Sequence, residues 1–195
     1  TFDVHTTKSV FRKTGYNRVG NQKSQAFPSA VWFGGYDKHG RDLPWRPRWP
    51  DLAPAFHVWL AEIMLQQPVV ATVIPYFLDF TRRWPSINDL ASAPLDDVLA
   101  AWAGLGYYAR ARNLHKAAVM VATEWGGQFS GDHRHANDVA DLRALPGVGP
   151  YTAGAIAAIA FGQQAVVVDG NIERLFSRYF AITTPLPAAK TEIAA

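Results

Sequence analysis

Hydrophobic residues recur at helical spacing over most of the chain, and prolines and glycines stand at the ends of these runs. The run from Pro54 to Gln66 begins with a proline and has apolar residues on every side, the pattern of a buried helix. In the next run, Pro75 predicts a kink. Helices are predicted over residues 54–66, 69–84, 94–103, 107–124, 138–144, 150–161 and 170–180. Only residues 165–168 are strand-like, too few for a sheet, so the pattern predicts an all-α fold.

The first 30 residues lack this periodicity. They are polar, and their five Lys and Arg residues against a single Asp give a local charge of +4. Because the net charge of the chain is +3, residues 31–195 sum to −1. We expect residues 1–30 to form a flexible basic extension, although their composition also fits a transit peptide. A nucleic acid bound by the folded part would therefore be held by a local basic surface and backbone amides.

Composition narrows the classes of function. Hydrophobic residues make up 49% of the chain and charged residues 18%, which is typical of a globular protein rather than a disordered one. The absence of cysteine excludes a disulfide framework, a thiolate nucleophile and a cysteine-ligated metal centre within these residues. The histidines show no metal-binding spacing, and no apolar run reaches membrane-spanning length. We therefore expect neither a bound metal nor a membrane partner.

A glycine-rich turn in the segment LPGVGPYTAGAI joins two of the predicted helices. Gly147 and Gly149, on either side of Val148, allow a sharp turn and a close approach of the backbone to a ligand. Pro150 then begins a helix whose first N–H groups have no partner within the helix. Such a turn can bind an anion, which on DNA is a backbone phosphate. The alternative is an ordinary connection between helices, which two glycines alone do not exclude.

Two acidic residues are candidates for catalysis. Glu62 is the only acidic residue between Asp51 and Asp79 and lies in the most apolar predicted helix. Burial there would raise the pKa of its carboxyl and suit it to act as a general acid, unless it pairs with a buried cation for packing. Asp169 precedes the helix that begins at Gly170, so its default role is an N-cap, which also fixes a carboxylate. A neutral acid and a fixed carboxylate are the pair used to cleave glycosidic bonds.

Aromatic and basic residues alternate in the segment GLGYYARARNLHK, which contains no acidic residue. Tyr107 is followed by Arg110 and Arg112, and an aromatic side chain with nearby cations suits a distorted duplex. Gln66, one helical turn after Glu62, shares a helix face with it. The alternative for the basic segment is a solvated helix face whose tyrosines belong to the core.

Taken together, these segments resemble the MutY-type adenine DNA glycosylases of the helix-hairpin-helix superfamily. The resemblance covers about residues 32–181 and rests on several long segments in the same order, which is more specific than a single hairpin motif. These segments are RDLPWR at 41–46, WLAEIMLQQ at 59–67, VATVIPYF at 70–77, GLGYYARARNLHKAA at 104–118, LPGVGPYTAGAI at 145–156 and VDGN at 168–171.

This resemblance implies hydrolysis of the N-glycosidic bond of adenine mispaired with 8-oxoguanine or guanine in duplex DNA, through a flipped-out nucleotide. Glu62 matches the acid that protonates the adenine ring. Asp169 matches the carboxylate that stabilises or transiently bonds the cationic sugar, and Asn171 and Tyr151 match residues that support it. The reaction implied is that of a monofunctional glycosylase.

The resemblance also implies how the duplex and the adenine are held. Gln67 and Tyr107 match residues that wedge into the duplex, with Gln66 beside them. Backbone phosphates would be bound by the hairpin from Gly147 to Gly149 and by the two arginines of the basic segment. Positions near the adenine pocket are matched by Arg41, Trp45, Arg46 and Leu65.

The implied architecture has two helical modules. Residues 43–165 would form a six-helix barrel that contains the hairpin, and residues 31–42 and 166–195 would form part of a second, cluster-side module that is incomplete here. The family's four cysteine ligands of a 4Fe-4S cluster, and its domain that recognises 8-oxoguanine, would lie beyond Ala195. We therefore expect no cofactor within this chain and a cluster in a longer parent protein.

Two other functions remain open. Endonuclease III-like lyases carry a Lys for Schiff-base chemistry at the position of Tyr151, which disfavours that class. A non-catalytic fragment that binds mismatches is disfavoured because both Glu62 and Asp169 are present. Pro68 stands where the family usually has Thr, and the loop at 130–137 is longer than usual. We expect a monomer on double-stranded DNA, in the bacterial cytoplasm or nucleoid, or in a eukaryotic nucleus or mitochondrion.

Overall fold

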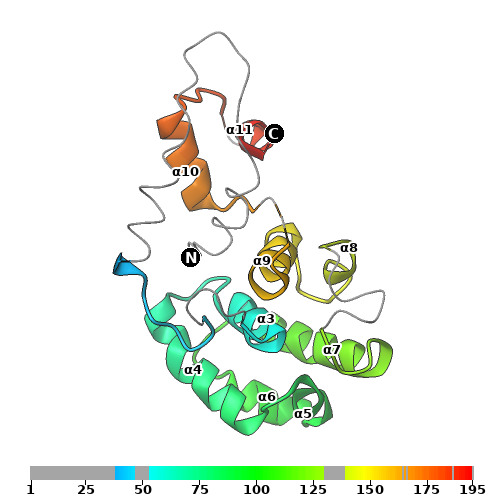
Figure 1. The fold of residues 1–195 in the computed structure, drawn as a ribbon. Helices are drawn as coiled ribbons and strands as arrows, with labels where there is room; N and C mark the ends of the chain where they lie inside the picture. The colour runs from blue at the N-terminus through cyan, green and yellow to red at the C-terminus, as the bar shows by residue number, and fades with distance from the viewer. Residues whose placement is uncertain are drawn as a thin grey trace.

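The described part of the chain is helical. The computed structural model describes residues 38–46, 53–129, 139–163, 165, 167–185 and 187–194. Its helices are α3 (Ala55–Met64), α4 (Val70–Arg83), α5 (Ile87–Ser92), α6 (Leu95–Ala101), α7 (Ala109–Glu124), α8 (Val139–Leu142), α9 (Pro150–Phe161), α10 (Gly170–Tyr179) and α11 (Ala188–Ala194). Within these ranges there is no strand, only an isolated β-bridge between Leu43 and Arg46, so the predicted all-α class is confirmed (Figure 1). No helix within them could cross a lipid bilayer.

Helix α3 lies at the centre of the larger hydrophobic cluster. It packs against α4, α7 and α9, and Figure 1 shows α3 beside α9. Every residue of α9 from Thr152 to Ala160 is buried, and most of them are alanine or glycine. Small side chains allow neighbouring helices to approach closely. The two helices that carry Glu62 and Tyr151 are therefore held rigidly against each other.

Helix α5 was not predicted, although its start carries a local signal. The Ser86 hydroxyl accepts a hydrogen bond from the backbone N–H of Asp89, and the Asp89 carboxylate accepts one from the N–H of Ser86. This reciprocal capping box satisfies donors that a helix start otherwise leaves unpaired. The helix contains only six residues, too few to show hydrophobic periodicity. The capping residues were therefore the signal that could have identified it.

A second, smaller hydrophobic cluster holds α10 and α11. Val168 and Phe176 are buried in it with Ala189 and Ile193. Figure 1 shows this helix pair set apart from α3 and α9. Helix α11 was not predicted, and the expected strand-like run contributes no strand at its described residues 165, 167 and 168. The predicted assembly of residues 31–42 with 166–195 stays a prediction, since residues 31–37 lie outside the described residues, as does the expected extension at 1–30.

His57 makes the stability of the fold depend on pH. Its ring on α3 meets the Phe77 ring of α4 nearly edge-on, with centroids 5.5 Å apart. Burial lowers the pKa of His57 below its ordinary value of 6.5. As the pH falls through 6.5, the unfolded chain binds more protons than the folded chain, so stability is present above this pH and lost as the pH falls through the lowered pKa.

We therefore expect the urea midpoint of unfolding to fall between about pH 7 and pH 5, and His57→Leu to make this fall shallower. Urea unfolding followed by circular dichroism measures both slopes. His39→Leu, at an exposed histidine, controls for the loss of an imidazole. An unchanged slope in His57→Leu would show that His57 does not contribute.

Candidate active site

The face of α3 that carries Glu62 runs from the core to the solvent. Trp59 is fully buried, with its ring 5.5 Å from that of Phe129. Glu62 is half-buried, and Gln66 is exposed. Glu62 is thus less buried than the sequence predicted, although its neighbours Ala61 and Ile63 are almost fully buried. A carboxyl at this boundary can reach a ligand while its helix stays fixed in the core.

Gln66 links the end of α3 to the glycine-rich hairpin. Its side-chain Nε2 donates a hydrogen bond to the carbonyl oxygen of Gly147 at 3.1 Å. The neighbouring Gln67 is exposed, as a residue that enters DNA must be. The Gln66 contact fixes the hairpin relative to the helix of Glu62. Its predicted contact with DNA stays a prediction.

The hairpin has the geometry that the sequence predicted for a sharp turn. Gly147 has a φ of +80°, and the N–H of the buried Val148 donates to the carbonyl of Leu145 at 3.1 Å. Gly149 is the N-cap of α9 and offers no side chain to its first N–H groups. The turn itself is exposed, as binding of a backbone phosphate at the start of a helix requires. Tyr151, in the first turn of α9, is half-buried.

The two hairpin glycines predict different responses to alanine. At Gly147 the positive φ is unfavourable for any side chain, and a Cβ would lie 3.1 Å from the Cβ of Asn113. Gly147→Ala should therefore lose about 1–2 kcal/mol, or about 2–8 °C in Tm. At Gly149 a Cβ would meet nothing within 4 Å. Gly149→Ala should stay within about 0.5 kcal/mol of wild type, because reduced unfolded-chain entropy offsets its poorer capping. Equal losses by thermal melting would contradict this account.

Asp169 is the N-cap of α10, as predicted. One carboxylate oxygen accepts hydrogen bonds from the backbone N–H groups of Asn171 at 3.0 Å and Ile172 at 2.8 Å. The other oxygen accepts a bond from the side-chain Nδ2 of Asn171 at 3.1 Å. The Asn171 amide oxygen in turn accepts from the Arg174 guanidinium, which fixes the orientation of that amide. Asp169 and Asn171 are therefore brought together as one rigid polar unit.

Glu62 and Asp169 lie on helices of different hydrophobic clusters. Glu62 is on α3 in the larger cluster, whereas α10 packs with α11 in the smaller one. Figure 1 shows α10 set apart from α3 and α9. Their meeting across one groove therefore stays a prediction.

Tyr107 is presented to solvent by an unusual backbone. It has a φ of +49° and its side chain is 68% exposed. Left-handed conformations of bulky residues are unfavourable and are found where the surrounding structure holds them in place, often at functional sites. The predicted helix start at residue 107 is therefore wrong, and α7 begins at Ala109. An exposed aromatic ring on a constrained loop is suited to enter a duplex.

Trp102, which no sequence motif singled out, supports this loop. The Nε1 of the buried Trp102 donates to the carbonyl of Gly106 at 3.0 Å, and the hydroxyl of Tyr76 donates to the carbonyl of Ala103 at 2.8 Å. The sequence signal for an irregular loop here was its pair of glycines, Gly104 and Gly106. Both have a positive φ in the structure.

Arg110 is directed into the protein rather than toward a ligand. It is only 9% exposed, and its guanidinium donates four hydrogen bonds to backbone carbonyls of α3 and of the loop before α7. The group also lies 5.3 Å from the centroid of the Trp102 ring. The structure therefore does not support the predicted contact between Arg110 and DNA, because the side chain is buried and both terminal guanidinium nitrogens donate to backbone carbonyls inside the protein. Arg112 is exposed and remains a candidate for contact with phosphate.

Two of the four residues predicted near the adenine pocket are buried. Trp45 is 6% exposed, and its ring meets Phe77 edge-on with centroids 5.1 Å apart, so it contributes to the core. Arg46 is buried and donates its guanidinium to the carbonyl of Arg41, which is itself exposed. Leu65 is the half-buried C-cap of α3. A pocket formed by these residues stays a prediction.

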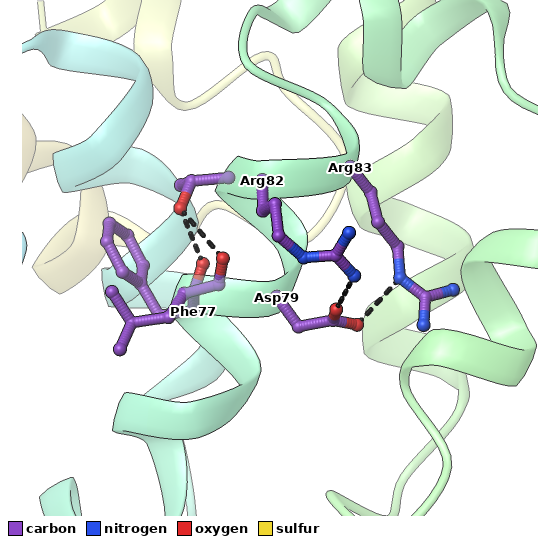
Figure 2. A network of polar contacts seen from close by, with 6 residues as sticks. Phe77, Asp79, Arg82 and Arg83 are labelled. Atoms are coloured by element: carbon purple, nitrogen blue, oxygen red, sulfur yellow. Dashed lines mark hydrogen bonds and ion pairs between the residues drawn. The ribbon is translucent and has the colours of Figure 1, made fainter.

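The arginines at the end of α4 have an acidic partner. Figure 2 shows Asp79 between Arg82 and Arg83, with contacts of 2.6 Å and 2.7 Å. The hydrogen bond from Arg82 is the main reason that the pKa of Asp79 lies below its usual value. These two cations are partly neutralised on their own helix, so they would contribute less to a phosphate-binding surface than an arginine without an acidic neighbour.

The residues of this chain do not fit the 4Fe-4S cluster that the family resemblance implies. Such a cluster is held by cysteine thiolates, and the sequence contains no cysteine. Across the described ranges, no group of three or more His, Asp or Glu side chains is placed to hold a metal ion either.

Comparison with known proteins gives consistent results. The sequence matches the family model described as HhH-GPD superfamily base excision DNA repair protein over residues 60–194. It is 51% identical over 151 residues to the adenine DNA glycosylase of Homo sapiens, covering 75% of this chain and 27% of that protein. It is 42% identical over 148 residues to the adenine DNA glycosylase of Buchnera aphidicola subsp. Baizongia pistaciae (strain Bp), covering 75% and 39%. The chain thus spans less than half the length of these relatives.

Solved structures agree with this result. A thermostable thymine-DNA glycosylase aligns with a TM-score of 0.67 at 26% identity, covering 77% of this chain and 65% of that chain. A non-covalent endonuclease III–DNA complex aligns with a TM-score of 0.64 at 23% identity, covering 84% and 73%, and shows the shared fold. Because the family model spans more than half of the sequence, this chain belongs to the HhH-GPD superfamily of base excision DNA repair proteins.

Proposed function

We propose that this chain forms the catalytic core of a monofunctional adenine DNA glycosylase, which hydrolyses the N-glycosidic bond of adenine mispaired with 8-oxoguanine or guanine. The main support is the carboxylate of Asp169, held at the start of α10 by three hydrogen bonds. A carboxylate fixed in this way can stabilise a positive charge that develops beside it without first reorganising. The names of the similar proteins support adenine as the base.

The proposed reaction is dissociative. Glu62 donates a proton to a ring nitrogen of the flipped-out adenine, so that the base leaves as a neutral molecule. The bond between the base and the sugar breaks with its electrons going to the base, and the Asp169 carboxylate stabilises the sugar cation. Water then adds to the anomeric carbon and gives up a proton, which the Glu62 carboxylate left by the first step accepts. The half-buried position of Glu62 on a fixed helix suits this role.

The proposed partner is double-stranded DNA that contains the mispair, bound by the protein as a monomer. The hairpin from Gly147 to Gly149 and the start of α9 would hold a backbone phosphate, with Arg112 close in sequence to the wedge residue Tyr107. Tyr107 and Gln67 would fill the space left by the flipped nucleotide. The site of action would be where DNA is kept: the bacterial cytoplasm or nucleoid, or a eukaryotic nucleus or mitochondrion.

The absence of an amine at Tyr151 favours hydrolysis without strand cleavage. A lyase forms a Schiff base between a lysine and the sugar, and a phenol cannot form one. The test uses end-labelled duplex with adenine opposite 8-oxoguanine and the full-length protein. We expect strand breaks only after treatment with alkali, and no covalent complex with borohydride. Breaks without alkali, together with borohydride trapping, would indicate a lyase, and no breaks under either condition would indicate a non-catalytic DNA-binding protein.

A further inference from the structure

The guanidinium of Arg110 joins the end of α3 to the loop that carries Tyr107. Nη1 donates to the carbonyls of Ile63 at 3.3 Å and Met64 at 3.0 Å, in the last turn of α3. Nη2 donates to the carbonyls of Leu105 at 2.9 Å and Gly106 at 3.2 Å, directly before Tyr107. One planar group thus bridges two backbone segments that are more than forty residues apart in sequence.

The two segments differ in how firmly the rest of the fold holds them. The end of α3 is part of the core, since Ile63 and Met64 are almost fully buried. The loop before α7 contains three residues of positive φ, Gly104, Gly106 and Tyr107. Glycine adopts a positive φ readily, but the positive φ of Tyr107 persists only where other contacts hold it. Arg110 therefore fastens an irregular loop to a rigid helix.

We propose that Arg110 is a positioning residue, which holds the ring of Tyr107 at a fixed place relative to α3 so that the ring can fill the duplex when adenine flips out. This inference rests on the proposed function for the role of Tyr107. It assigns to Arg110 a task in base flipping rather than in contact with DNA. A planar group with several donors in fixed directions is needed to hold four carbonyls, so a lysine should not replace it.

The test compares Arg110→Lys with wild type in the full-length protein. Flipping is followed by the fluorescence of 2-aminopurine placed at the position of the target adenine, opposite 8-oxoguanine. Excision is followed under single-turnover conditions on two substrates, with adenine opposite 8-oxoguanine or opposite an abasic-site analogue. Unpairing costs little in the second substrate. Arg82→Lys, at an exposed arginine of α4, is the matched control.

We expect Arg110→Lys to lose most of the 2-aminopurine signal and to slow excision opposite 8-oxoguanine by about 10- to 100-fold, as misplacement of a positioning group does. Opposite the abasic analogue we expect a slowing of about threefold or less, because little pairing must be broken. Arg82→Lys should match wild type on both substrates. Equal slowing on both substrates, or a normal fluorescence signal, would overturn the proposal.

A second variant keeps the proposal testable if Arg110→Lys does not fold. Trp102→Phe removes the other side-chain hydrogen bond to the Gly106 carbonyl and keeps an aromatic ring in the core. Trp102→Phe should slow excision opposite 8-oxoguanine more than excision opposite the abasic analogue, with a smaller difference than Arg110→Lys shows. Equal slowing on both substrates would overturn the proposal. A wild-type protein that flips 2-aminopurine but excises adenine from neither substrate would refute the proposed function, while the fluorescence would still decide the role of Arg110.

Discussion

Asp169→Asn should slow single-turnover excision of adenine by at least about 10²- to 10³-fold, while the stability of the fold and the affinity for DNA change little. The carboxylate provides the negative charge that the sugar cation needs, and an amide of nearly the same shape does not. Asparagine is as good an N-cap as aspartate. The substitution therefore removes the charge and keeps the start of α10 intact.

Two further variants separate charge from capping. Asp169→Ser retains a capping oxygen without a charge and should be as inactive as Asp169→Asn. Asp169→Ala removes both and should in addition lose about 1 kcal/mol of stability, because the N–H groups of Asn171 and Ile172 lose their acceptor. Excision by Asp169→Asn at the wild-type rate would mean that this residue is only a cap.

Glu62→Gln should slow excision by about 10²- to 10⁴-fold, the usual contribution of a general acid. Glutamine has almost the same size and keeps the hydrogen-bonding capacity of the side chain, but it cannot give up a proton to the leaving base. Because Glu62 is only half-buried, we expect the fold to tolerate the change. Single-turnover excision and thermal melting measure the two effects separately.

The matched control for this substitution is Glu124→Gln, at an exposed glutamate in the last turn of α7. It makes the same chemical change at the surface of the same protein and should leave the excision rate at the wild-type level. If Glu62→Gln excises adenine as fast as this control, the protonation step belongs to another residue or to water.

Features that depend on a few adjacent residues could be predicted from the sequence. The N-cap at Asp169 follows from the residue type that precedes a helical run. The helix predicted at 150–161 is followed directly by a glycine, and Gly162 closes α9 with a φ of +62°. The hairpin turn at Gly147 could also be predicted from adjacent residues, because its left-handed backbone needs a residue without a Cβ.

Features that depend on distant contacts could not be predicted. Arg110 lies in a basic segment, and only the packing of α7 against α3 shows that its guanidinium turns inward onto the carbonyls of Ile63 and Met64. The positive φ of Tyr107 similarly depends on that packing, since a tyrosine in isolation favours other conformations. The depth of Glu62 depends on where α3 leaves the core, which periodicity alone does not determine.

The central claim is that the carboxyls of Glu62 and Asp169 act on the same nucleotide. The most direct test is a crystal structure of the Asp169→Asn protein bound to a duplex with adenine opposite 8-oxoguanine. We predict a flipped-out adenine between α3 and α10, with the Glu62 carboxyl about 2.6–3.2 Å from a ring nitrogen and the side chain at position 169 beneath the deoxyribose. An extruded adenine that only one of these two side chains can reach would contradict the account.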